Sequence, residues 1–85
     1  MYGASAPRDG TGTVFVRELH AGEFTAIWQG DQDEPQAHID VDGTRSEVLA
    51  WVSRCRAAKF LALDPEQDDY VPFTVTDGII GELPW

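Results

Sequence analysis

The chain contains few of the residues that usually carry covalent, metal or redox chemistry. Its 85 positions include one cysteine, one methionine and two histidines. A single thiol cannot form an internal disulfide, so the sequence excludes a disulfide-stapled secreted fold. No stretch approaches the roughly 18 apolar residues of a membrane span, and the first residues lack the basic start and apolar middle of a signal peptide. We therefore expect a cytoplasmic protein that does not bind a membrane.

Positive charge is also scarce. Fifteen acidic residues against six basic ones leave a net charge of -9, which should repel phosphate backbones, so no direct contact with nucleic acid is expected. Four of the six cations are Arg45, Arg54, Arg56 and Lys59. They have two interpretations: complementation of a helix dipole, or a basic patch that meets a phosphate or an acidic partner. The first is favoured, because no glycine-rich phosphate loop accompanies them.

One segment, between Asp42 and Lys59, has the pattern of an amphipathic helix. Thr44-Arg45-Ser46-Glu47 matches a capping box, in which the Thr44 hydroxyl and the Glu47 carboxylate each accept from the other's backbone amide. Apolar side chains then recur on one stripe, at Val48, Val52 and Cys55. Arg54, Arg56 and Lys59 are expected in the last turns of this helix, where cations oppose the negative end of its dipole.

Four further segments have strand character. Thr13 to His20 and Phe24 to Gln29 flank a short turn and predict a hairpin. Alternation at Ala37, Ile39 and Val41 predicts a third strand, and the apolar run Lys59 to Leu63 predicts a fourth. The expected fold class is α+β: a three-stranded antiparallel meander, one amphipathic helix packed on one face, and a short fourth strand (βββαβ). A right-handed crossover places the fourth strand parallel to the first, in the order 3-2-1-4.

The two ends of the chain differ from this central unit. Residues 1–12 are rich in glycine and small polar residues and predict a flexible arm. Residues 13–69 form the single domain. Residues 70–85 are expected to form an edge strand or hairpin, because Pro72 cannot donate within a ladder and Asp77-Gly78 is a two-residue hairpin signal. The aromatic tail that ends in Trp85 docks either on the domain or on a partner.

Cys55, His20 and His38 are the residues from which a catalytic or metal site would have to be built. Their spacing matches no ligand signature, and a thiol on the apolar stripe of a helix is expected to be buried and unreactive. The acidic runs 31–34 and 64–69 lack the glycine and glutamate positions of an EF-hand loop and are interpreted as solvated loops. We therefore expect no catalytic residues, no metal site and no cofactor.

Large aromatic residues are the more informative candidates, because a domain of this size hides few of them and interface hot spots are enriched in them. Trp28 and Trp51 are assigned to the core. The candidate partner-binding residues combine the aromatic carboxyl-terminal segment with the acidic loops: Tyr70, Phe73, Trp85, Asp68, Asp69, Asp31 and Asp33.

The order hairpin, acidic turn, third strand, capped helix and short strand, from about Val14 to Leu63, resembles the small domain of HicB-type antitoxins. Phe24-Thr25-Ala26 and the helix start Gly43-Thr44-Arg45-Ser46-Glu47 carry the resemblance. In place of the family's Pro-Asp-x-Pro-Gly-Cys-like turn the chain has Gly30-Asp31-Gln32-Asp33-Glu34-Pro35, and no appended DNA-binding domain is expected. The resemblance implies the βββαβ fold.

Three functions follow as hypotheses. The first is a non-enzymatic module that binds another protein, with a homodimer through a sheet edge as one form of this. The second is an antitoxin-like or nucleic-acid-mimicking inhibitor that uses the net charge of -9 to occupy a basic groove on a toxin or nuclease. The third is a small metal-binding protein or accessory enzyme built around His20, His38 and Cys55.

Overall fold

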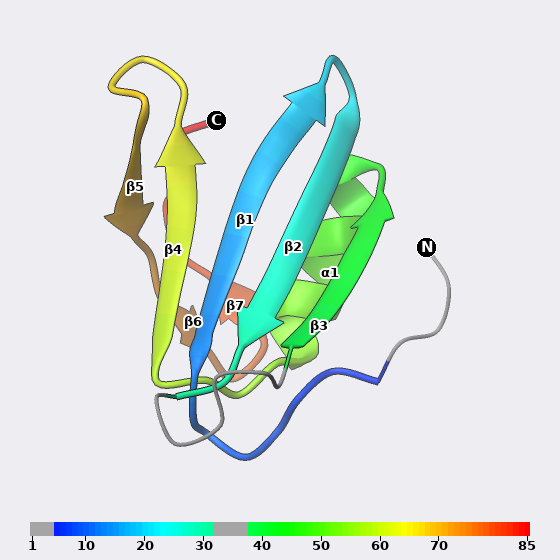
Figure 1. The fold of residues 1–85 in the computed structure, drawn as a ribbon, viewed down its shortest axis with the longest axis vertical. Helices are drawn as coiled ribbons and strands as arrows, with labels where there is room; N and C mark the ends of the chain where they lie inside the picture. Colours follow the sequence, from blue (N-terminus) through cyan, green and yellow to red (C-terminus); the bar gives the residue numbers. More distant parts are fainter. Residues whose placement is uncertain (1–4, 32–37) are drawn as a thin grey trace.

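The computed structural model, which describes residues 5–31 and 38–85, is a β-sheet with one helix on one face (Figure 1). The α+β class expected from the sequence is confirmed. The elements in chain order are β1 (Thr13–His20), β2 (Glu23–Gln29), β3 (His38–Gly43), α1 (Arg45–Arg54), β4 (Lys59–Asp64), β5 (Asp69–Pro72), β6 (Val75–Thr76) and β7 (Ile79–Ile80).

The main sheet has five strands in the order β3-β2-β1-β4-β5. Strands β1 and β4 run parallel, and every other neighbouring pair is antiparallel. The predicted order 3-2-1-4 therefore describes the first four strands. β5 extends the sheet beyond the predicted βββαβ unit, because Asp69 to Pro72 pairs with β4 as a second edge strand.

Helix α1 begins as the capping box predicts and ends earlier than expected. The Glu47 amide donates to the Thr44 hydroxyl at 3.2 Å, and the Thr44 amide donates to the Glu47 carboxylate at 3.0 Å. The helix ends at Arg54, because Cys55 is extended and the Arg56 amide donates to the Pro7 carbonyl. The prediction that Arg56 and Lys59 occupy the last turn of the helix is wrong: Arg54 alone does so, and Lys59 begins β4.

The core lies between α1 and the inner face of the sheet, which we define as the face that α1 covers. Trp51 of α1 is its largest fully buried side chain. The buried apolar residues come from β1, β2, β3, α1 and β4, together with the helix C-cap and the segment after β5: Val14, Val16, Phe24, Ala26, Trp28, Val41, Val48, Trp51, Val52, Cys55, Ala62 and Phe73. Trp28 and Trp51 are therefore core residues, as expected from the sequence.

The chain after β5 crosses behind the sheet toward α1 (Figure 1). The Phe73 amide donates to the Phe60 carbonyl at 3.0 Å, and β6 and β7 then form the two-residue hairpin that Asp77-Gly78 predicts. Both turn residues have positive φ, 53° at Asp77 and 78° at Gly78, as a type I′ turn requires.

Residues 5–12 of the segment predicted to be a flexible arm lie against the lower end of the domain. The Gly12 carbonyl accepts from the amides of Ala58 and Lys59, and the Trp28 indole donates to the Thr11 carbonyl at 2.8 Å. Gly12 itself has a φ of 79°, and a Cβ at this position would lie 2.7 Å from the Trp28 Nε1 atom. Only glycine fits this crossing without displacing its neighbours.

Candidate interaction surface

The outer face of the sheet, opposite α1, carries apolar side chains where a solvated face is normally polar. One row of cross-strand neighbours crosses all five strands: Asp40, Ile27, Phe15, Leu61 and Pro72. In Figure 1, α1 and the β6–β7 hairpin lie behind the sheet, and no described helix or strand lies in front of it. Ile27 is 37% exposed in the middle of this row. Among the residues that the structure describes, no helix or strand therefore covers this row, and its four apolar side chains remain partly exposed.

A second pair of neighbours, on β4 and β5, continues this surface. Leu63 and Tyr70 are cross-strand neighbours on β4 and β5, and both are half-buried. The Tyr70 ring meets Phe15 edge-to-face, with centroids 5.3 Å apart, although β4 lies between their strands. We call the set Phe15, Ile27, Leu61, Leu63, Tyr70 and Pro72 the apolar band.

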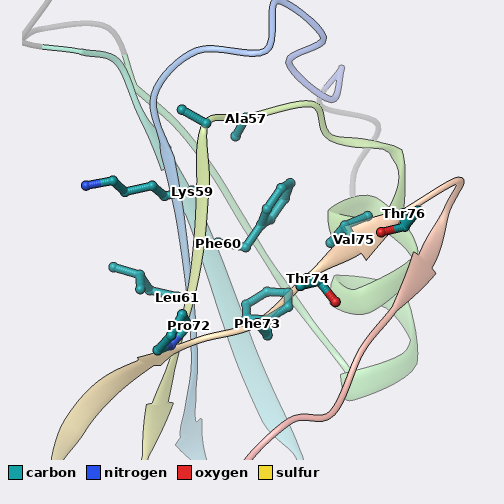
Figure 2. Close-up of a pocket in the computed structure, with 10 residues that line it drawn as sticks. Ala57, Lys59, Phe60, Leu61, Pro72, Phe73, Thr74, Val75 and Thr76 are labelled. Atoms are coloured by element: carbon teal, nitrogen blue, oxygen red, sulfur yellow. The ribbon is translucent and has the colours of Figure 1, made fainter.

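A pocket of about 520 Å³ adjoins the lower end of the band, where β5 ends (Figure 2). Leu61 and Pro72 of the band form one side, and Phe60, Phe73 and Val75 form the other. In Figure 2, the Lys59 side chain points away from Phe60 and Val75, so its ammonium group does not lie between these two side chains. The lining is mainly apolar and suits an apolar side chain of a partner better than a charged group.

The predicted site residues Tyr70 and Phe73 lie in different environments. Tyr70 belongs to the apolar band and keeps part of its ring at the surface. Phe73 is 7% exposed and packs against Phe60, with ring centroids 5.6 Å apart. Phe73 therefore supports the pocket wall from the core.

Trp85 folds back on the domain. Its ring packs on Phe24 with centroids 5.0 Å apart, and its indole donates to the Leu63 carbonyl at 2.9 Å. The Arg45 guanidinium lies 5.4 Å from the ring centroid and donates to the Trp85 carbonyl at 3.3 Å. These contacts place Trp85 over the upper end of the core.

The acidic candidates are not gathered into one site. Asp31 follows β2 at the lower end of the sheet and accepts from the Gly12 amide at 3.1 Å, whereas Asp68 and Asp69 lie at the upper end, in and after the β4–β5 turn. The Asp69 carboxylate accepts from the Tyr70 amide, and Asp68 has a φ of 52°. Asp33 lies outside the described residues. The described acids thus lie at separate turns and loops, where the Asp31 and Asp69 carboxylates each accept from a backbone amide.

The four cations Arg45, Arg54, Arg56 and Lys59 do not form one patch. Arg45 begins α1 and Arg54 ends it, so the length of the helix, roughly 13 Å, separates them. At the carboxyl end of α1, Arg54 and Arg56 are joined by Arg8, whose guanidinium donates to the Arg54 carbonyl at 3.3 Å.

The residues considered for a thiol or metal site are also far apart. His20 pairs with Glu23 at one end of β2 and His38 with Gln29 at the other, which separates them by roughly 20 Å. Cys55 is buried, and its Sγ donates to the Trp51 carbonyl. Burial raises the pKa of the Cys55 thiol to about 12. Among residues 5–31 and 38–85, no group of three or more His, Cys, Asp or Glu side chains is placed to hold a metal ion.

Comparison of the chain with protein-family models, curated proteins and solved structures gave no match. Within the part of the chain that the structure describes, no helix is long and apolar enough to cross a membrane.

The sequence pattern alone did not identify the apolar band. Val14-Phe15-Val16 breaks the alternation of a half-buried strand, and this break is the signal of a strand that is apolar on both faces. Val14 and Val16 face the core, and Phe15 faces outward beside Ile27 and Leu61. Because β1 pairs with β2 on one side and β4 on the other, Phe15 lies between Ile27 and Leu61, and the three side chains form one continuous surface.

Proposed function

We propose that this protein is a non-enzymatic module that binds another protein through the apolar band on the outer face of its sheet. The observation that carries the proposal is the register row in which Ile27, Phe15, Leu61 and Pro72 lie side by side on four strands. Contiguous exposed apolar surface with a polar margin is typical of protein interaction sites. The adjoining pocket beside Leu61 and Pro72 offers a recess for one anchoring side chain.

A second candidate function is inhibition of a basic toxin or nuclease, as the resemblance to HicB-type antitoxins suggests. The net charge of -9 supports it, and so does the exposure of Asp40 and Asp42 on edge strand β3. This function uses the same outer face, with the acidic edge as the part that meets the basic groove. Binding that weakens strongly with added salt is expected for it, because exposed charges are screened over about 8 Å at physiological ionic strength.

The proposal is tested by affinity capture from native lysate with the wild-type chain and two matched variants. Ile27→Lys places a charge in the band, and Ile79→Lys makes the same change at an isoleucine that is 71% exposed on β7. We expect a partner that is recovered with the wild type and Ile79→Lys and lost with Ile27→Lys. Circular dichroism confirms that both variants are folded. Equal recovery with both folded variants would contradict the proposal.

A further inference from the structure

We infer that the partner of the outer face is a basic amphipathic segment, with an apolar stripe for the band and lysine or arginine on the side that meets β3 and the hairpin tips. This inference rests on the proposed function and adds the chemistry and the orientation of the partner. The observation that supports this inference is the distribution of charged residues around the apolar band.

On the β3 side, carboxylates directly border the band. Asp40 is the cross-strand neighbour of Ile27, and Asp42 is the neighbour of Thr25, so both share the outer face with the band. Directly opposed residues in an antiparallel pair have Cβ atoms about 4.5 to 5.5 Å apart. A segment that covers Ile27 must therefore place its own margin beside the Asp40 and Asp42 carboxylates.

The upper end of the sheet is also acidic. The β1–β2 tip carries Glu18 and Glu23, and the β4–β5 tip carries Glu66, Asp68 and Asp69. Arg17, the cross-strand neighbour of Thr25, is an exposed cation on the outer face near the first of these tips. Both tips lie at the top of Figure 1. The described charged residues along the β3 side and at the upper end of the band are thus mainly acidic, with Arg17 as a cation on the outer face two residues after Phe15.

The opposite end of the molecule carries most of the cations. The topology brings together the carboxyl end of α1 and the starts of β1 and β4, and with them Arg8, Arg54, Arg56 and Lys59. Asp9, Asp31 and Asp77 lie at this end too, so the charges of the described residues nearly cancel there, whereas at the upper end the described acidic residues outnumber Arg17 and Arg45. This asymmetry favours one orientation of a basic partner over the reverse.

A second copy of this chain fits the surface less well. Two chains that each carry -9 repel one another. The two carboxylates beside the band would also have to be desolvated or opposed by the same acidic surface. A partner with positive margins gains from both features, and such complementarity raises association rates and selects the partner. An amphipathic helix has the required shape, because it would cover the outer face of the sheet as α1 covers the inner face.

Synthetic peptides of about 18 residues, long enough to form a helix, test the inference against the full chain. One peptide has a leucine stripe flanked by lysines, the second has the same stripe flanked by glutamates, and the third has the lysine composition in scrambled order. Amide chemical shifts of the protein are followed by NMR during each titration. We expect the lysine-flanked peptide to shift the signals of Phe15, Ile27, Leu61 and Tyr70 and to bind at least tenfold more tightly than the other two.

Charge-reversal variants locate the complementary carboxylates. The variant Asp40→Lys should weaken binding of the lysine-flanked peptide at least tenfold, because Asp40 is the cross-strand neighbour of Ile27. Asp9→Lys, which reverses an exposed charge at the other end of the molecule, should change it less than threefold. If both variants weaken binding equally, the effect comes from the net charge of the protein and not from the position of Asp40. That result would overturn the inference.

Other outcomes separate the inference from the proposed function. Equal binding of the lysine-flanked and glutamate-flanked peptides at the band overturns the partner chemistry and leaves the proposed surface standing. Shifts confined to the free edge of β3 indicate strand addition, and a dimer in sedimentation that Ile27→Lys abolishes indicates a second copy. Either result overturns the inference. If no peptide shifts the band, the inference fails, and the capture experiment with Ile27→Lys decides the proposed function separately.

Discussion

The indole ring of Trp85 lies on the phenyl ring of Phe24, with centroids 5.0 Å apart. This contact joins the last residue of the chain to the inner face of β2. The Trp85 indole also donates to the Leu63 carbonyl on β4, so one side chain ties together two strands that β1 separates. The aromatic tail is therefore part of the packing of the domain.

Replacement of Trp85 by alanine should lower the free energy of unfolding by about 1 to 3 kcal/mol, since it removes an aromatic pair, a hydrogen bond and a cation–π contact. Urea denaturation measures the change. Ile79→Ala, at a side chain that is 71% exposed, should change stability by less than about 0.5 kcal/mol. A Trp85→Ala chain as stable as the wild type would show that the tail does not pack on the domain in solution.

Replacement of Gly12 by alanine should be more destabilising than replacement of Gly22. Both residues have positive φ, 79° and 80°, so both variants carry the backbone strain of about 1 kcal/mol. At Gly12 the new Cβ would also clash with the Gln29 carbonyl oxygen and the Trp28 indole, whereas at Gly22 nothing lies within 4 Å. Thermal unfolding of the two variants gives the comparison. Equal effects would mean that residues 11 and 12 do not cross β2 as closely as described.

Replacement of Thr44 by alanine should cost about 0.5 to 2 kcal/mol, because the Glu47 amide loses its capping acceptor. Thr44→Ser keeps the hydroxyl and should retain most of the stability. The measurement is denaturant unfolding followed by far-ultraviolet circular dichroism. A Thr44→Ser chain that is as unstable as Thr44→Ala would assign the loss to the threonine methyl group instead of the cap.

Cys55 should make stability fall at alkaline pH. Burial raises the pKa of its thiol to about 12 in the folded chain, whereas an unfolded cysteine has a pKa near 8.5. Its contribution is therefore fully present below about pH 8.5 and is lost as the pH rises toward 12, because the unfolded state ionises first. Denaturation between pH 8 and 10.5 should show a steeper decline for the wild type than for Cys55→Ala. Parallel declines, with rapid reaction of the native thiol at pH 8, would contradict a buried thiol.

The sequence predicts correctly those elements whose local residue pattern agrees with the environment that they have in the folded domain. The Thr44–Glu47 cap, the β1–β2 hairpin and the Asp77-Gly78 turn all depend on residues close together in the chain, and the structure confirms them. The end of the helix was not predictable in this way. It is set by hydrogen bonds from Arg56 to Pro7 and from Lys59 to Gly12, which join segments far apart in sequence.

The candidate surface was only partly predictable for the same reason. Tyr70 was recognised as an edge aromatic residue, and it lies in the apolar band. Phe15, Ile27 and Leu61 are ordinary strand residues in the sequence and become neighbours only because β1 pairs with β2 on one side and with β4 on the other. A surface assembled from one residue per strand has no linear signature.

Site-specific photo-crosslinking tests the central claim, that the outer face of the sheet binds a partner, most directly. A benzophenone side chain is placed at position 27 on the outer face, and in a second chain at position 79, where the isoleucine side chain is 71% exposed. On irradiation in cells, the account predicts a discrete adduct with another protein from position 27 and none from position 79. Identical adducts from both positions, or none from position 27 in a folded chain, would contradict it.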